Sequence, residues 1–248
     1  KCDLFVCASH SEGFSTAATE ALIVGTPVCT VEVSGMKEML GEHNEWGIVT
    51  ENNEEALYQG IKKLLDDSEL LEHYRRQAAM RALLVGRTII GERVWDIMKA
   101  IDVLTTKFAD IIDRDKVLCM GNSGGGTATF YAGCLEERIK VCVPSCAVCT
   151  YGASILAMAH CDCNYIPGVR RYFDMGDLGC LVAPRGYVQV NGSEDKIFPI
   201  GGAKESFENI KKAYKKLGVE DKCHMVIGDG GHRFYPVQAW PIVKELIK

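Results

Sequence analysis

The stretch Lys116–Gly133 reads KVLCMGNSGGGTATFYAG, and it decides the fold expected for the C-terminal part of the chain. A strand-like run, residues 116–120, leads into Gly121-Asn122-Ser123-Gly124-Gly125, and a helix-like run, residues 125–137, follows. A G-x-S-x-G sequence between a strand and a helix predicts a tight turn that lifts the serine above a sheet. Ser123 is therefore a candidate nucleophile, and it needs a base because a free serine hydroxyl reacts poorly.

Strand-like and helix-like runs alternate on both sides of this turn. Before it, residues 91–108 place Val94, Ile97, Met98, Ile101 and Leu104 on one helical face. After it, the sequence predicts a strand at 139–143, a long irregular stretch at 145–183, a strand within 185–195, a helix at 203–218, a strand at 223–228 and a closing helix from 236. This alternation is typical of an α/β fold with parallel strands.

The first 82 residues show the same alternation. Short strands are predicted within 2–9, 26–33 and 46–50, and helices within 11–25, at 35–40, from Asn53 and over 67–82. For the whole chain we expect an α/β fold, with a mainly parallel sheet flanked by helices on both faces.

Composition and charge narrow the classes of partner. The 248 residues are 47% hydrophobic and 25% charged, as in an ordinary globular protein. The net charge is -5, and this argues against binding of nucleic acid, which requires a basic surface. No apolar run approaches the roughly 20 residues that span a bilayer. We expect no nucleic-acid partner and no membrane segment, and a cytoplasmic location.

The chain has 12 cysteines, and most lie in or beside apolar runs. This placement favours reduced, buried thiols in a cytosolic protein. The densest group, Cys146-x-x-Cys149 and Cys161-x-Cys163 with His160 adjacent, could form a zinc site, but the second pair is too close for the usual zinc spacing. We expect no disulfide and no metal there.

The N-terminal motif is Glu12-Gly13-Phe14, with Glu20 eight residues after Glu12 and then Gly25-Thr26-Pro27-Val28. Glu12 and Glu20 lie two helical turns apart, so their carboxylates share nearly one face. Taken alone, they could be an acidic helix start and a solvated carboxylate. Residues 1–82 as a whole resemble the Rossmann-like donor half of retaining GT-B glycosyltransferases. The resemblance implies that Glu12 contacts a donor sugar, Glu20 the ribose, and the backbone near Gly13 and Phe14 the diphosphate of a nucleotide-sugar.

The C-terminal motifs resemble a different family. GRTIIGERVWDIMKAIDVL, GNSGGGTATFYAG, HCDCNYIPG and VNGSEDKIFPIGGA, from residues 84–248, resemble the α/β-hydrolase superfamily in its acetyl xylan esterase and dienelactone-hydrolase-like branch. The resemblance implies a three-layer sandwich and a catalytic order of Ser, Asp and His along the chain.

Two residues fit the remaining catalytic positions. Asp195 and His232 each follow a predicted strand, so both can meet Ser123 at the carboxyl edge of a parallel sheet. His232 is the expected base and Asp195 its orienting carboxylate. Glu194 and Asp229 compete with Asp195 for the acid, and His160 and His224 compete with His232 for the base. We expect His224 to be structural and His160 to be a packed loop residue.

The two resemblances divide the chain into a partial donor-binding segment, 1–82, and a partial esterase domain, 83–248. The backbone N–H of Gly124 is the expected first oxyanion donor, but the loop that supplies a second donor in this fold would precede residue 84. We expect a serine carboxylic ester hydrolase that removes acyl, such as acetyl, groups from a carbohydrate and needs no cofactor. The alternatives are a hexosyltransferase using a nucleotide-sugar, and a non-catalytic fused scaffold.

The two partial domains also lead to a prediction of how their strands pair. An open sheet edge favours aggregation, so we expect strands 4–8 and 27–33 to join the sheet that contains 116–120.

Overall fold

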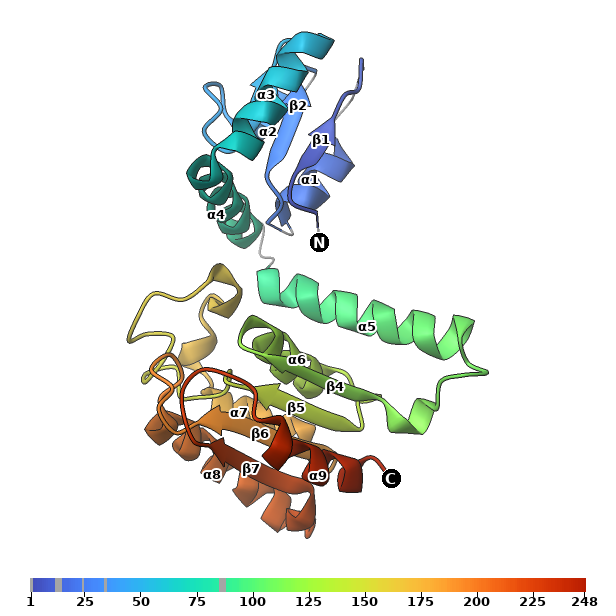
Figure 1. Cartoon of the computed structure of the whole chain (residues 1–248), viewed down its shortest axis with the longest axis vertical. Coiled ribbons are helices and arrows are strands. Elements are labelled where there is room, and N and C mark those ends of the chain that lie inside the picture. Colours follow the sequence, from blue (N-terminus) through green and yellow to red (C-terminus); the bar gives the residue numbers. More distant parts are fainter. Residues whose placement is uncertain (1, 12–14, 24, 34, 85–87) are drawn as a thin grey trace. The chain divides into compact units, whose positions relative to one another are not determined.

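The computed structural model describes residues 2–11, 15–23, 25–33, 35–84 and 88–248. The chain forms two compact units, Lys1–Glu92 and Arg93–Lys248, each with its own parallel sheet (Figure 1). Within the described residues, no helix has the length and apolar character needed to cross a bilayer.

The N-terminal unit is a three-stranded parallel sheet with the order β1-β2-β3. Phe5 pairs with Val28, and Cys29 pairs with Ile48. Its elements are β1 (Phe5–Cys7), α1 (Thr16–Ile23), β2 (Val28–Val31), α2 (Met36–Leu40), β3 (Ile48–Thr50), α3 (Glu54–Asp66) and α4 (Ser68–Leu84).

Both faces of this sheet are covered by helices of the same unit. On β2, Val28 packs with residues of α1 and α2, whereas the next residue, Cys29, points to the opposite face and packs with Leu64 of α3. Val28 and Cys29 are both fully buried, as expected for the central strand of a parallel sheet. Asn53 caps α3 by accepting a hydrogen bond from the Ala56 N–H at 2.8 Å.

The C-terminal unit is a four-stranded parallel sheet with the order β4-β5-β6-β7. Its strands are β4 (Leu118–Asn122), β5 (Val141–Ser145), β6 (Gly186–Gly192) and β7 (Cys223–Gly228). Its helices are α5 (Ile89–Lys107), whose first turn precedes Arg93, α6 (Gly124–Leu135), α7 (Met175–Gly179), α8 (Ile200–Lys216) and α9 (Pro236–Leu246).

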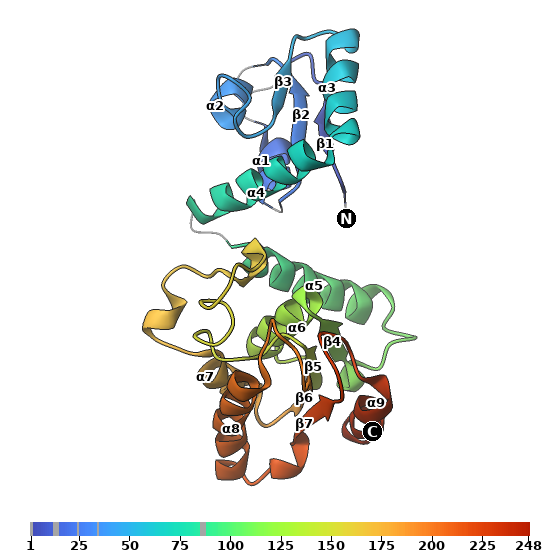
Figure 2. The ribbon, with the colours of Figure 1, turned by 60° about the vertical axis from the view of Figure 1, so that its left-hand side comes forward.

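This second sheet is the middle layer of three. Helix α9 covers the face that carries Val141, Val188 and Val226, and α6 and α8 cover the other face (Figure 2). Gly133 of α6 lies so close to β5 that a Cβ there would be 2.4 Å from Cys142 Sγ. The helices on both faces bury the strands, which is the three-layer arrangement expected from the sequence.

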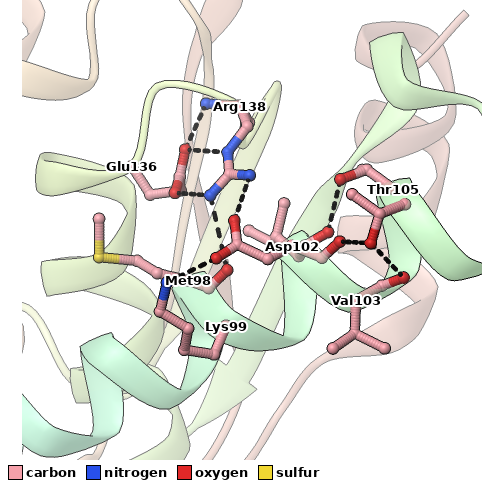
Figure 3. A network of polar contacts seen from close by, with 9 residues as sticks. Met98, Lys99, Asp102, Val103, Thr105, Glu136 and Arg138 are labelled. Carbon is pink, nitrogen blue, oxygen red and sulfur yellow. Dashed lines mark hydrogen bonds and ion pairs between the residues drawn. The ribbon is translucent and has the colours of Figure 1, made fainter.

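An ion-pair cluster ties α5 to the end of α6 (Figure 3). Arg138 donates to Asp102 at 2.7 Å and to Glu136 at 2.6 and 2.8 Å, and Lys99 contacts Asp102 at 2.7 Å. The Arg138 guanidinium lowers the pKa of Glu136, and Lys99 and Arg138 lower the pKa of Asp102. The charged cluster therefore fixes α5 beside the C-terminal sheet.

The expected α/β class with parallel strands is confirmed, but the expected merging of the two sets of strands is wrong. Among the described residues, strands 5–7 and 28–31 pair with each other, and strand 118–122 pairs with 141–145 in a separate sheet. The physical reason is that each short sheet is already buried by helices of its own unit, so apolar burial does not require a shared sheet.

Candidate active site

Ser123 lies on the tight turn between β4 and α6. Its backbone angles are φ 56° and ψ -124°, a conformation that costs a non-glycine residue about 1–3 kcal/mol. The turn is held by the Ser123 N–H, which donates to the Ser145 carbonyl at 2.9 Å, and by the Thr127 N–H, which donates to the Ser123 carbonyl at 2.8 Å. This strained turn is the local geometry expected from the G-x-S-x-G sequence.

The glycines around Ser123 are required by close backbone contacts. A Cβ on Gly121 would lie 2.4 Å from the backbone of Gly125, and a Cβ on Gly126 would lie 2.4 Å from the Ser145 carbonyl oxygen. Real Cβ atoms do not approach other atoms this closely, so larger residues would open the turn. The local sequence therefore sets the position of Ser123.

Asp195 and His232 are joined at the carboxyl edge of the sheet. Asp195 follows β6 and His232 follows β7, and Asp195 Oδ2 lies 2.8 Å from His232 Nδ1. The other carboxylate oxygen, Oδ1, accepts the N–H groups of Ile197 at 2.9 Å and Phe198 at 3.1 Å. Burial alone would raise the pKa of Asp195, but the hydrogen bonds from Phe198, His232 and Ile197 lower it overall. Asp195 is thus a buried, ionised carboxylate.

The histidine ring is oriented with its second nitrogen available. An ionised Asp195 can only accept a hydrogen bond, so Nδ1 of the ring carries the proton and the lone pair of the neutral ring lies on Nε2. The ring stacks on Phe198 with centroids 6.0 Å apart. Nε2 is buried and has no hydrogen-bond partner in the part of the chain that the structure describes. Such an unsatisfied buried group costs about 1–3 kcal/mol, so it indicates a role in chemistry.

Ser123 opens on a hollow of about 180 Å³. Among the described residues, Ser123 Oγ and His232 Nε2 do not form a hydrogen bond. Catalytic hydrogen bonds are often long in the absence of substrate, so this geometry is compatible with a later contact. The hollow is lined by Ser123, Gly124, Thr127, Ala159, His160, Cys161, Asn164, Ile197 and Phe198.

A second imidazole, His160, lines the same hollow. Its Nε2 lies 3.2 Å from Ser154 Oγ, and its ring lies edge-on to Phe198 at 5.4 Å. Burial lowers the pKa of His160. The expectation of a packed loop residue therefore missed that His160 faces the hollow, although it lacks the carboxylate partner that His232 has.

The competing carboxylates and the third candidate histidine do not reach the site. Glu194 and Asp229 are exposed, and among the described contacts neither touches His232. His224 Nε2 lies 2.8 Å from the Asp221 carbonyl at the start of β7, which is a structural contact. Of Asp195, Glu194 and Asp229, it is Asp195 that is hydrogen-bonded to His232.

The described cysteines are all free thiols. Cys146 Sγ donates to the Arg233 carbonyl at 3.3 Å, and Cys149 Sγ to the Pro199 carbonyl at 3.5 Å. Within the described part of the chain, the group of three or more residues that could hold a metal is Cys146, Asp195 and His232. Burial raises the pKa of Cys146 to about 11, and Asp195 and His232 bind each other, so this group is a poor metal site.

Two further groups, which the sequence did not connect with Ser123, lie beside the neighbouring Gly124. The Arg93 guanidinium lies 3.4 Å from the point where a Cβ on Gly124 would be, and Cys163 Sγ lies 4.0 Å from the same point. Gly124 is the first residue of α6, where backbone N–H groups lack helical partners. Arg93 lies on α5, and no local pattern in the sequence connects it with Ser123.

The expected nucleotide-sugar residues are only partly described. Glu12, Gly13 and Phe14 lie outside the described residues. Glu20 lies on α1 and its side chain is exposed.

Known proteins of two kinds are similar to parts of the chain. Residues 1–81 match the family model "Glycosyl transferases group 1". Over 84 residues the chain is 39% identical to the N-acetylgalactosamine-N,N'-diacetylbacillosaminyl-diphospho-undecaprenol 4-alpha-N-acetylgalactosaminyltransferase of Campylobacter jejuni, covering 33% of this chain and 23% of that protein. The N-terminal part is thus similar to a segment of the group 1 glycosyl transferases.

A different relative matches more of the chain. The Bacillus subtilis (strain 168) protein named "Putative hydrolase YtaP" is 26% identical over 153 residues, which is 60% of this chain and 50% of that protein. The chain therefore spans half the length of this relative, and less than a quarter of the transferase.

Glucuronoyl esterases are among the solved structures with a similar fold. A carbohydrate esterase family 15 glucuronoyl esterase from Caldicellulosiruptor kristjansonii has a TM-score of 0.54 at 22% identity, covering 62% of this chain and 48% of that one. A glucuronoyl esterase from Solibacter usitatus has a TM-score of 0.51 at 19% identity, covering 63% and 47%. At this identity the likeness shows the fold, and the expected α/β-hydrolase fold is confirmed.

Proposed function

We propose that the C-terminal unit is a serine-dependent carboxylic ester hydrolase that removes acyl groups from a carbohydrate. The observation that carries the proposal is the Asp195–His232 pair, whose free, buried Nε2 lies at the same sheet edge as the strained Ser123 turn. The fold of the glucuronoyl esterases and the similarity to the Bacillus subtilis protein support the assignment. We place the boundary between the two family segments near residue 82, where the glycosyltransferase match ends.

In the proposed mechanism, Ser123 Oγ attacks the ester carbonyl carbon and its proton passes to His232 Nε2. Asp195 keeps the proton on Nδ1 and stabilises the imidazolium that forms. The Gly124 N–H donates to the developing oxyanion. The alcohol then leaves with the proton from His232, and a water molecule deprotonated by His232 hydrolyses the acyl-Ser123 ester.

The mechanism requires a hydrogen bond between Ser123 Oγ and His232 Nε2, and we expect it to close when substrate fills the hollow. Phe198 positions the histidine for this step, because it stacks on the ring and its N–H fixes Asp195.

Hydrolysis of an activated aryl acetate by the full chain tests the proposal. We expect turnover that disappears in Ser123→Ala, and Asp229→Asn serves as a matched control because Asp229 is exposed near His232 in sequence. Turnover that survives Ser123→Ala in folded protein would rule the proposal out. An acetylated sugar and a methyl ester of a uronic acid, compared at equal concentration, show on which side of the ester the carbohydrate lies.

We propose a second candidate function for residues 1–82, which is binding of a nucleotide-sugar through Glu12 and Glu20. The family match and the 39% identity to a transferase favour it. Titration calorimetry with a UDP-sugar tests it, with Glu20→Gln as the variant and Glu38→Gln, a change on α2, as the control. Absence of binding would leave this part as a scaffold without a ligand.

A further inference from the structure

Two thiols lie beside the hollow that contains Ser123. Cys161 is exposed and lines the hollow, whereas Cys163 is 2% exposed, and their sulfur atoms are 2.9 Å apart. They lie at a 3-10 turn, Asp162–Asn164, within the long irregular stretch. The ester hydrolysis proposed above does not use either thiol.

The surroundings of Cys161 favour its thiolate form. The hydrogen bond from Cys163 is the largest influence, and it lowers the pKa of Cys161 to about 6 together with the positive charge of Arg93 and a bond from Asn164, against the opposing effect of burial. The same bond to Cys161 raises the pKa of Cys163, so Cys163 keeps its proton. Cys161 is therefore the more acidic sulfur of the pair, and the more exposed one.

Two polar side chains connect this thiol pair to the Ser123 turn. Asn164 Nδ2 lies 3.2 Å from Cys161 Sγ and 3.3 Å from the Cys161 carbonyl oxygen. Thr127 Oγ1 lies 3.2 Å from Asn164 Oδ1 and 3.3 Å from the Ser123 carbonyl oxygen. Asn164 and Thr127 are almost fully buried, so these hydrogen bonds form a packed connection between Cys161 and the Ser123 turn.

We propose that Cys161 and Cys163 form an oxidation site for hydroperoxides, and that the resulting disulfide lowers the reactivity of Ser123. The second part rests on the proposed esterase function, whereas the first part does not. An exposed sulfur 2.9 Å from a buried one, at the edge of an open hollow, is the geometry of an attacking thiol and its resolving partner.

The chemistry balances with one peroxide. The Cys161 thiolate attacks one peroxide oxygen, so that an S–O bond forms, the O–O bond breaks and the departing hydroxide takes up a proton as water. Cys163 sulfur then attacks the sulfenic sulfur of Cys161, so that an S–S bond forms and the hydroxyl leaves as water with the Cys163 proton. The two sulfur atoms together lose two electrons, the peroxide gains two, and a small dithiol reverses the change.

The disulfide alters the hollow in a defined way. It removes the thiolate that accepts the Asn164 amide hydrogen bond and that balances the charge of Arg93. Asn164 must then rearrange, and its partner Thr127 lies one helical turn after Ser123. We therefore expect slower acylation of Ser123 in the oxidised protein.

Mass spectrometry of the full chain after treatment with hydrogen peroxide tests the site. We expect the Cys161–Cys163 peptide to lose the mass of two hydrogens and to regain it with dithiothreitol. In Cys163→Ser we expect a sulfenic acid on Cys161 that dimedone traps. Cys2→Ser is the matched control, because Cys2 is also exposed but has no thiol beside it among the described residues. If Cys2 in the wild type is oxidised as fast as Cys161, or if no disulfide forms between Cys161 and Cys163, the proposed oxidation site is wrong.

A second readout separates this proposal from the esterase proposal. The oxidised and reduced samples are treated with a fluorophosphonate, and we expect less adduct on Ser123 after oxidation in the wild type but not in Cys161→Ser. Equal labelling of oxidised and reduced wild type would overturn the effect on Ser123. If reduced protein forms the disulfide with peroxide but never labels at Ser123, the esterase proposal and the proposed effect on Ser123 fail, while the oxidation site stands on its mass change.

Discussion

Replacing Asp195 by asparagine tests how His232 is held. The new side chain could still accept the backbone N–H groups of Ile197 and Phe198 through its carbonyl oxygen. Its amide group would then face His232 Nδ1 at about the present 2.8 Å, so two donors would meet. The ring would respond by placing its proton on Nε2, and it could no longer accept the proton of Ser123.

The expected magnitude follows from this change of tautomer. The same substitution in a serine-histidine-aspartate triad lowers kcat by about 10⁴-fold, which corresponds to about 5.4 kcal/mol in activation free energy. Partial rescue by another carboxylate is not expected, because Glu194 and Asp229 are exposed and do not contact His232 in the described structure.

The assay is the second-order rate of Ser123 labelling by a fluorophosphonate in wild type and in Asp195→Asn. Asp229→Asn and Glu194→Gln are the controls, and both should label at the wild-type rate. A rate for Asp195→Asn within tenfold of wild type, in protein that is folded by circular dichroism, would refute the reasoning. An equally large loss in Asp229→Asn would refute the choice of carboxylate.

Three further predictions follow from packing, charge and family. Gly126→Ala should lower the free energy of unfolding by about 1–3 kcal/mol in urea titrations, because its Cβ would lie 2.4 Å from a carbonyl oxygen, whereas Gly125→Ala, with open space at its Cβ, should not. Arg138→Met should destabilise the protein in urea titrations, because it leaves the Glu136 carboxylate, which is 6% exposed, without its charged partner. Arg138 lowers the pKa of Glu136 in the folded state, so the stabilisation of the protein by ionised Glu136 is present above the ordinary pKa of 4.5 and is lost as the pH falls through the lowered pKa of the folded protein. The thermal unfolding temperature below pH 5 should therefore depend less on pH in Arg138→Met. Glu20→Gln should weaken UDP-sugar binding at least tenfold by calorimetry if the N-terminal segment binds it, about the loss of one hydrogen bond to a charged group.

The sequence predicts the Ser123 turn well because its causes are local. Gly126 approaches the Ser145 carbonyl on β5, which is not local, but the approach of Gly121 to Gly125 is encoded by residues within a few positions of Ser123. The same holds for the strands and helices, whose bounds depend on periodicity and on caps such as Asn53. The positions of Asp195 and His232 could also be predicted, because each follows a strand of one parallel sheet.

Other features depend on contacts between distant residues. The sequence left Asp195, Glu194 and Asp229 open, and burial of Asp195 against the N–H groups of 197 and 198 decides between them. His160 and Cys161 come from a long stretch without periodicity, and their place beside Ser123 depends on how that stretch folds back over α6. Arg93 comes from α5, a helix that ends well before the Ser123 turn in the chain.

The pairing of strands was also beyond the sequence. The expected merging of the two sets of strands assumed that open edges must be covered, but short strands such as 5–7 are instead stabilised by helices on both faces of their own sheet. Which strands become neighbours is a non-local choice that alternation of runs does not specify.

The most direct test of the account is to map the fluorophosphonate adduct by peptide mass spectrometry in wild type, His232→Ala and His160→Ala. Both histidine rings lie against Phe198, which lines the Ser123 hollow, but only His232 is paired with a carboxylate in the described structure. The account predicts an adduct on Ser123 in wild type and in His160→Ala, and its loss in His232→Ala. An adduct that persists in His232→Ala and disappears in His160→Ala, or no adduct on folded wild-type protein, would contradict it.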